Sequence, residues 1–144
     1  MGLRLHWRRA DYSDLDSVRH LYSDLTPDLE DFDHYFKTVL EDSHSWPLIV
    51  EENNRPIAFV FCHECISLSS GRSLYIDEMV VHEDRRGKGV GTEILSELAQ
   101  MSIDQGIDCL ELRVSLSKPE LHRFYERNGF VHRGRFYSKL IRFS

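Results

Sequence analysis

The stretch of sequence that decides the fold is Val81-His82-Glu83-Asp84-Arg85-Arg86-Gly87-Lys88-Gly89-Val90-Gly91-Thr92. An apolar run precedes it and the apolar spacing of a helix follows it, so we predict a loop between a strand and a helix. Its glycines allow several backbone N–H groups to turn toward one point, where the positive end of the helix dipole favours an anion. Three basic side chains lie in the same loop: Arg85, Arg86 and Lys88. The stretch therefore predicts a binding site for a phosphate or pyrophosphate.

Two common phosphate loops do not match this stretch. The dinucleotide fingerprint Gly-x-Gly-x-x-Gly differs in spacing, because the glycines here occupy positions 87, 89 and 91. The P-loop ends in Gly-Lys-Ser or Gly-Lys-Thr, and neither follows the last glycine. The alternative without a ligand is a glycine-rich turn whose basic side chains are simply solvated.

Predicted strands and helices alternate along the rest of the chain. Alternating apolar and polar residues are typical of a half-buried strand, and apolar residues three and four apart are typical of a helix. We expect strands at 3–9, 47–52, 56–68, 72–82 and 107–116, a hairpin turn at 52–55, and one or two further strands within 130–143. We expect helices from Asp11, Ser13 or Asp14 to Leu25, over 28–42 after Pro27, from the glycine loop to Gly106, and from Pro119 to Asn128. No repeat or linker interrupts this order, so residues 1–144 are predicted to form one α/β domain.

Length and charge narrow the class of protein. A chain of 144 residues with 41% hydrophobic residues suits a single domain with a packed core. The formal net charge of −6 argues against a dedicated nucleic-acid binder. The charge is uneven, because residues 1–54 hold 12 acidic and five basic residues whereas residues 55–144 hold 12 acidic and 13 basic residues.

The sequence shows no signal for export or for a membrane. The first nine residues contain three arginines and lack the apolar core of a signal peptide, and no run approaches the about 18 apolar residues of a spanning helix. Three cysteines, an odd number, favour a reduced, cytoplasmic setting. Cys62-His63-Glu64-Cys65 looks like half of a metal site, but alternation along a strand puts its side chains on two faces, so no metal is predicted.

Two blocks of sequence resemble the GNAT superfamily of acyl-CoA-dependent N-acyltransferases. Residues 86–91 match its Arg/Gln-x-x-Gly-x-Gly/Ala signature, and residues 121–130 resemble its Phe-Tyr-x-x-x-Gly-Phe segment through Phe124, Tyr125, Gly129 and Phe130. Residues 122–125 and 135–139 also resemble the aminoalkylphosphonate N-acetyltransferase branch. The resemblance implies a single GNAT-type α/β domain, with a mixed central sheet of about six to seven strands flanked by about four helices.

The resemblance also implies how acetyl-CoA, the cosubstrate, is bound. The backbone of Met79, Val80 and Val81 is expected to pair with the pantetheine arm, at a bulge that splays this strand from its neighbour. The amides of the signature loop are expected to hold the pyrophosphate, with the Thr92 hydroxyl at the helix start. These loop residues are Arg86, Gly87, Lys88, Gly89, Val90 and Gly91. Ser117 is expected to add a hydroxyl to the pantetheine arm.

The implied chemistry is attack of an amine on a thioester, which needs a proton acceptor for the amine and a proton donor for the thiolate. Tyr125 matches the tyrosine that serves as the donor. Glu78 or Asp77 is expected to act as the base, directly or through water. Adjacent residues of a regular strand point to opposite faces, and the phosphonate branch has its acid nearer to Tyr75, so the choice between the two stays open. An amine that arrives neutral would need no base.

We therefore predict transfer of the acetyl group of acetyl-CoA to a primary amine of a small molecule in a ternary complex. The alternatives are a protein or peptide N-acetyltransferase and a non-catalytic acyl-CoA sensor. No nucleic acid, membrane or metal is expected as a partner, and a homodimer stays open. The acidic first third of the chain favours a cationic acceptor, which disagrees with an anionic phosphonate.

Overall fold

The computed structural model describes residues 4–23 and 30–142. The chain divides into two compact units, Met1–Leu112 and Arg113–Ser144. Several sequence predictions fall outside the described residues. They are the strand ends at Leu3 and Phe143, the end of the first helix at Leu25, the break at Pro27 and the start of the second helix at Asp28.

The first unit is built on one mixed sheet with the strand order β1-β2-β3-β4-β5. Strands β1 to β4 run antiparallel to one another in sequence, and β5 runs parallel to β4. The strands are β1 (His6–Arg9), β2 (Ser45–Glu52), β3 (Arg55–Ser67), β4 (Gly71–Val81) and β5 (Leu110–Leu112). A two-residue turn joins β2 to β3. Asn53 and Asn54 have φ angles of 52° and 62°, which confirms the predicted hairpin because such a turn needs positive φ at both positions.

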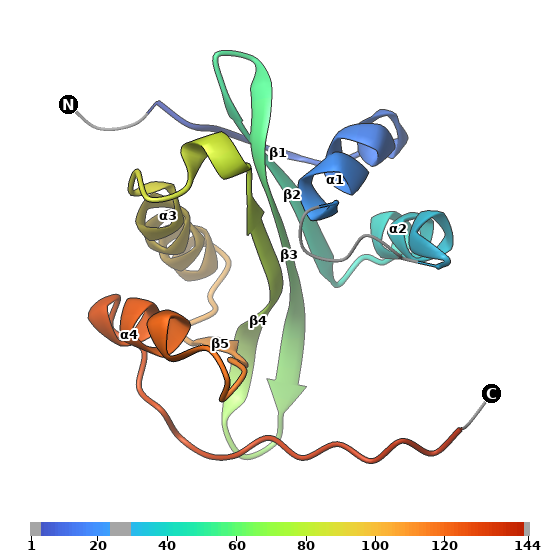
Figure 1. Cartoon of the computed structure of the whole chain (residues 1–144). Helices are drawn as coiled ribbons and strands as arrows, with labels where there is room; N and C mark the ends of the chain where they lie inside the picture. The colour runs from blue at the N-terminus through green and yellow to red at the C-terminus, as the bar shows by residue number, and fades with distance from the viewer. Residues whose placement is uncertain (1–3, 24–29, 143–144) are drawn as a thin grey trace. The chain divides into compact units, whose positions relative to one another are not determined.

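Helices cover both faces of this sheet. Figure 1 shows α1 (Leu15–Tyr22) and α2 (Phe32–Glu41) beside one face and α3 (Val90–Asp104) beside the other. The core on the first face includes Val18 and Tyr22 of α1, Phe36 of α2, Phe59 of β3 and Val80 of β4. Short 3-10 turns, η1 (Tyr12–Asp14) and η2 (Glu83–Arg85), precede α1 and the glycine loop.

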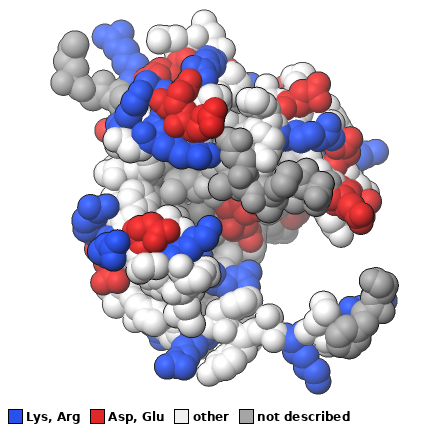
Figure 2. All heavy atoms as spheres, viewed as in Figure 1, with Lys and Arg blue, Asp and Glu red and all other residues white. Residues whose placement is uncertain are grey.

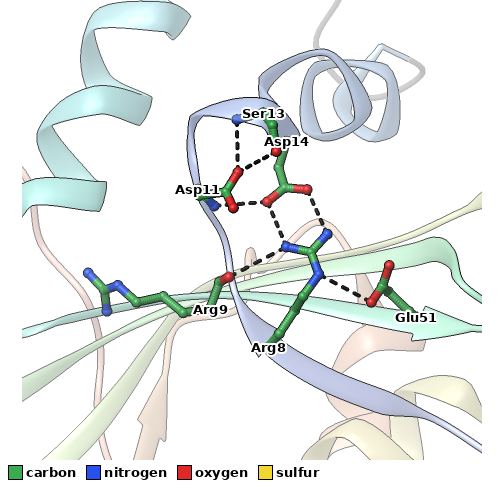
Figure 3. A network of polar contacts seen from close by, with 6 residues as sticks. All are labelled: Arg8, Arg9, Asp11, Ser13, Asp14 and Glu51. Atoms are coloured by element: carbon green, nitrogen blue, oxygen red, sulfur yellow. Dashed lines mark hydrogen bonds and ion pairs between the residues drawn. The ribbon is translucent and has the colours of Figure 1, made fainter.

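A partly buried ion pair ties the start of α1 to the sheet (Figure 3). The Arg8 guanidinium on β1 donates to both oxygens of the Asp14 carboxylate, at 2.8 and 2.7 Å, and its Nε donates to Glu51 Oε1 at 3.2 Å. Asp14 also accepts the backbone N–H of Asp11 at 2.8 Å. These contacts, the Arg8 hydrogen bond first, hold the pKa of Asp14 below its usual range.

The second unit contains α4 (Pro119–Arg127). Pro119 occupies the first turn, where a missing N–H costs nothing, and Gly129 ends the helix with a φ of 88°. Residues 128–142 contain neither helix nor strand.

The predicted number of strands is wrong for the described residues, which form five strands rather than six to seven. The strand expected at 107–116 is only three residues long, and no strand forms in residues 130–142. Alternation of apolar residues is not sufficient for a strand, because the backbone also needs a partner for its hydrogen bonds. Apolar side chains of this segment are largely exposed instead, as at Tyr137 (85%) and Ile141 (86%). The four α-helices agree with the expected number.

Candidate active site

A β-bulge in β4 organises the centre of the site. Phe61 of β3 lies opposite Glu78, and the next residue, Cys62, lies opposite Ile76, so Asp77 is the extra residue of the bulge. The extra residue of a bulge shifts by one position the alternation of side chains between the two faces of the strand. Glu78 and Tyr75 therefore share the face of β4 that α1 and α2 cover, opposite Phe61 and His63 of β3. The strand is not regular here, so the expectation that Asp77 and Glu78 point to opposite faces does not apply.

Glu78 lies against Tyr22 of α1. The Tyr22 ring is buried, with 7% of the residue exposed, and meets Phe32 and Phe59 edge-on at 5.5 and 6.3 Å between ring centroids. The pKa of Tyr22 is raised, chiefly by burial of the phenol. The negative charge of Glu78, which also accepts a hydrogen bond from the phenol, adds to this, and the charge of Asp77 contributes least. The Tyr22 hydroxyl therefore keeps its proton and donates a hydrogen bond to the Glu78 carboxylate.

Asp77 turns to β3 and meets His63. Asp77 Oδ2 and His63 Nδ1 are hydrogen-bonded. The imidazole also packs on the rings of Tyr75 and Phe61, with centroids 5.3 and 6.5 Å away. About a third of the His63 side chain (37%) and a fifth of the Asp77 side chain (20%) are exposed. The bulge thus produces two acid-containing pairs on one face, Tyr22 with Glu78 and His63 with Asp77.

A pocket of about 370 Å³ opens beside His63, between the end of α2 and the strands β2 and β3. Asp42 accepts the backbone N–H of His44 at 3.0 Å and the Ser45 hydroxyl at 2.8 Å. These two bonds, that of His44 first, lower the pKa of Asp42. The pocket therefore offers an ionised carboxylate near His63. Its lining residues are Thr38, Val39, Asp42, His44, Ser45, Phe61, His63 and Glu64.

The predicted glycine loop lies between η2 and α3. Gly87 and Gly89 have φ angles of 72° and 84°, a conformation that other residues rarely adopt. Glu93 N–H donates to Gly89 O at 3.1 Å, and Gly89 provides no side-chain cap for α3. The amides of the first helical turn, at Val90, Gly91 and Thr92, therefore lack partners within the helix and can bind an anion.

The basic side chains near the loop differ in what they contact. Arg85 is paired with Glu52 at 2.6 Å, and Arg86 Nε donates to the Val81 carbonyl at 2.9 Å. Lys88 is exposed. Arg55 pairs with Asp84 at 2.8 Å. Figure 2 shows acidic and basic side chains side by side on the face that it draws.

One edge of β4 is open beside the expected pantetheine residues. Met79, Val80 and Val81 pair with β3, whereas the pairing with β5 runs only from Leu74 to Ile76. Within the first unit, β4 therefore parts from β5 after Ile76 and leaves main-chain groups of 77–81 without a strand partner on that side. This agrees with the splayed strand that the resemblance implies.

Two predicted site residues, Tyr125 and Ser117, belong to the second unit. The Tyr125 ring packs against Phe124 and Phe130, with centroids 5.0 and 5.5 Å away, and burial raises the pKa of its phenol. Ser117 Oγ lies 2.8 Å from Ser115 Oγ. Their roles stay predictions.

Two residues of the site were missed in the sequence. His63 was considered only as part of a metal motif, although its spacing from Phe59 and Phe61 in a strand already places it on their face. Tyr22 has the spacing of an apolar residue in the first predicted helix, which gives no sign of a polar role. Among the described residues, no group of three or more His, Cys, Asp or Glu side chains could hold a metal ion.

Comparison with known proteins supports the resemblance. The profile of the acetyltransferase (GNAT) family matches residues 6–130. The chain belongs to this family. It is 28% identical over 130 residues to the uncharacterized N-acetyltransferase YhfO of Bacillus subtilis, covering 85% of this chain and 87% of the relative. It is 25% identical over 127 residues to the aminoalkylphosphonate N-acetyltransferase of Salmonella typhimurium, covering 85% of this chain and 82% of that one.

A solved GNAT structure shows the same fold. An aminoglycoside N-acetyltransferase, solved in complex with CoA, superposes with a TM-score of 0.77 at 18% identity, over 96% of this chain and 97% of the other. The prediction of a GNAT-family N-acetyltransferase is thus confirmed. No helix in the described part of the chain has the length and apolar character needed to cross a membrane.

Proposed function

We propose that this GNAT N-acetyltransferase transfers the acetyl group of acetyl-CoA to a primary amine of a small, cationic molecule. The observation that supports it most is the arrangement along β4. The middle of the strand carries Asp77 and Glu78 on the face of the acidic pocket, and its end leads into a loop with unpaired amides. One strand thus serves both substrates.

The donor side is the open edge of β4 and the loop that follows. Met79, Val80 and Val81 pair with the pantetheine amides, and the amides of residues 86–91 hold the pyrophosphate, with the Thr92 hydroxyl at the helix start. A solved relative that binds CoA has this fold, which favours acetyl-CoA as the cosubstrate. Ser117 adds a hydroxyl to the pantetheine arm.

The acceptor side is the pocket at the end of α2. Asp42 is held ionised by its hydrogen bonds, and Glu64 lines the same space, 3.6 Å from Arg72. Two carboxylates attract an ammonium group and repel a phosphonate. The acceptor therefore differs in charge from that of the aminoalkylphosphonate relative, although the sequences are similar.

The reaction needs one proton removed from the ammonium and one given to the sulfur. A carboxylate of the bulge, Glu78 or Asp77, takes part in the first transfer. Tyr125 supplies the second, because a phenol with a raised pKa holds its proton at neutral pH. A single domain, a homodimer and a cytoplasmic location remain predictions.

The experiment is a thiol-release assay with acetyl-CoA and a panel of amines: diaminobutane, spermidine, lysine methyl ester, aminoethylphosphonate and an N-terminal peptide. We expect turnover with the cationic small molecules and loss of kcat in Tyr125→Phe. Turnover with the peptide alone would show a protein N-acetyltransferase. Binding of acetyl-CoA, seen as a higher unfolding temperature, without turnover of any amine would show an acyl-CoA sensor.

A further inference from the structure

We propose that His63 is the general base of the acetyl transfer and that Asp77 is the residue that positions its ring. The proposal rests on the proposed function, since it names the proton acceptor of the same site. It is carried by the hydrogen bond between His63 and Asp77 across the bulge and by the place of His63 in the wall of the acceptor pocket.

The bulge explains why the pair exists. In a regular ladder, Asp77 would occupy a position opposite a β3 residue and its side chain would follow the pleat. As the extra residue, it has no opposite residue and reaches the neighbouring strand, where His63 lies opposite Tyr75. Bulges often redirect a side chain in this way near active sites.

The hydrogen bond decides which nitrogen of His63 is free. An ionised carboxylate has only acceptor oxygens, so Asp77 accepts a hydrogen bond from the Nδ1–H of His63. The proton of the neutral ring therefore lies on Nδ1. Nε2 then carries a lone pair. The rings of Tyr75 and Phe61 limit the rotation of the imidazole. A histidine oriented by a carboxylate is the arrangement that general-base catalysis uses in hydrolases.

Glu78 is less suited to the task. Its carboxylate already accepts a hydrogen bond from the Tyr22 phenol. A neutral imidazole is a stronger base than a carboxylate and accepts the ammonium proton more readily. Glu78 therefore contributes negative charge to this face, and His63 removes the proton from the ammonium group.

The charged and titratable groups that face His63 come from every neighbouring element. β4 contributes Asp77 and Tyr75, and the connection from α2 to β2 contributes Asp42 and His44. Glu64 adjoins it on β3, and Tyr22 and Glu78 lie further along the same face. Thr38 and Val39, the α2 residues in the pocket wall, do not titrate. The carboxylates among these groups attract the ammonium acceptor.

The step balances as follows. His63 Nε2 takes one proton from the ammonium group and passes it to solvent. The freed lone pair on nitrogen forms a bond to the thioester carbonyl carbon, and the C–S bond breaks with its electron pair going to sulfur. The thiolate receives one proton from the Tyr125 phenol, and the second N–H proton, which leaves the nitrogen as the amide forms, returns through solvent to the Tyr125 phenolate. The products are the acetylated amine, free CoA thiol and one proton.

The test compares His63→Gln and Asp77→Asn with His34→Gln, an exposed histidine on α2. With acetyl-CoA and diaminobutane, or whichever amine of the panel turns over, we expect kcat of His63→Gln to fall by about 10²–10⁴-fold with unchanged acetyl-CoA binding. The acidic limb of the kcat/KM profile due to His63 should disappear, and added imidazole should restore part of the rate in His63→Ala. Asp77→Asn should shift that limb to lower pH, because loss of the anion disfavours the imidazolium.

The outcomes separate the two proposals. Wild-type protein that binds acetyl-CoA but turns over no amine overturns the proposed function and the base with it. Turnover in His63→Gln equal to that in His34→Gln overturns the role of His63 alone. Nitrogen-15 NMR of the wild-type histidines decides independently of variant folding: we expect a neutral His63 protonated on Nδ1 that titrates at the midpoint of the acidic limb. Protonation on Nε2, or titration elsewhere, overturns the proposal.

Discussion

Tyr75 and Glu78 lie on the same face of β4, although they are three positions apart and a regular strand would place them on opposite faces. Their partners in β3, His63 and Phe61, are two residues apart. The extra residue, Asp77, makes the difference. By this shift Tyr75 and Glu78 both reach the face that carries α1 and α2, opposite His63 and Phe61 of β3.

The first prediction concerns the proton on Tyr22. Burial and the nearby Glu78 carboxylate raise the pKa of this phenol. Glu78→Gln removes the negative charge, so we expect Tyr22 to ionise at lower pH than in the wild type. Ultraviolet absorbance of tyrosinate, with Tyr22→Phe to assign the signal, measures it. An unchanged Tyr22 titration in Glu78→Gln would contradict the contact.

The same shift makes the folded state sensitive to alkali. An exposed tyrosine of the unfolded chain loses its proton near pH 10, whereas folded Tyr22 keeps it. Because its folded pKa is raised, the unfolded state binds fewer protons above pH 10, and the free energy of unfolding falls as the pH rises. We expect this fall to be smaller in Tyr22→Phe, as measured by urea unfolding between pH 9 and 11.

The second prediction separates the fold from the phosphate loop with two matched glycines. Gly89 and Gly71 both have a φ of 84°, and an added Cβ would meet no atom within 4 Å at either position. Replacement by alanine should therefore cost about 1–2 kcal/mol of strain at each. We expect only Gly89→Ala to raise the KM for acetyl-CoA, by about tenfold or more, since it displaces amides of the loop. Equal KM values in both variants would show that the loop does not bind the cosubstrate.

The third prediction concerns the basic residues of the loop. Lys88 is exposed, whereas Arg85 is held by Glu52. Lys88→Ala should raise the KM for acetyl-CoA about two- to fivefold and weaken its dependence on salt, as expected for an exposed contact to phosphate. Lys37→Ala on α2 is the control. Arg85→Gln should lower the free energy of unfolding and leave the KM for acetyl-CoA nearly unchanged. A raised KM with unchanged stability would assign Arg85 to the phosphate.

The glycine loop and the hairpin turn could be predicted because their chemistry is local. Positive φ at Gly87, Gly89, Asn53 and Asn54 reflects the residue at that position and little else. The resemblance implied a bulge in this strand, but its place could not be predicted from the residues, because the extra residue of β4 is defined only by its register with β3. The pair His63–Asp77 depends on that register, which explains why the sequence suggested the acids but not their histidine.

The C-terminal segment shows the opposite failure. Residues 130–142 have the alternation of a strand, but alternation describes a side-chain pattern and not a hydrogen-bonding partner. Phe136 and Tyr137 are both exposed, so this segment has no buried face that would decide a register.

The last prediction concerns the ion pair that anchors α1. Asp14 is buried and receives two hydrogen bonds from Arg8, so Asp14→Asn leaves the guanidinium with only Glu51 as an acidic partner. We expect a loss of about 1.5–3 kcal/mol at pH 7, the usual range for a hydrogen bond to a charged group. Because the folded pKa of Asp14 is lowered, its stabilisation is complete above the pKa of the unfolded chain, near 3.9, and is lost as the pH falls through the folded value. The free energies of unfolding of both proteins, measured in urea from pH 7 to pH 2, should therefore converge at the acid end.

Asp16→Asn, which removes a 3.9 Å surface contact to Arg19, is the control and should change stability little at any pH. A difference between wild type and Asp14→Asn that persists at pH 2 would mean that packing, and not the charge of Asp14, holds α1 to the sheet.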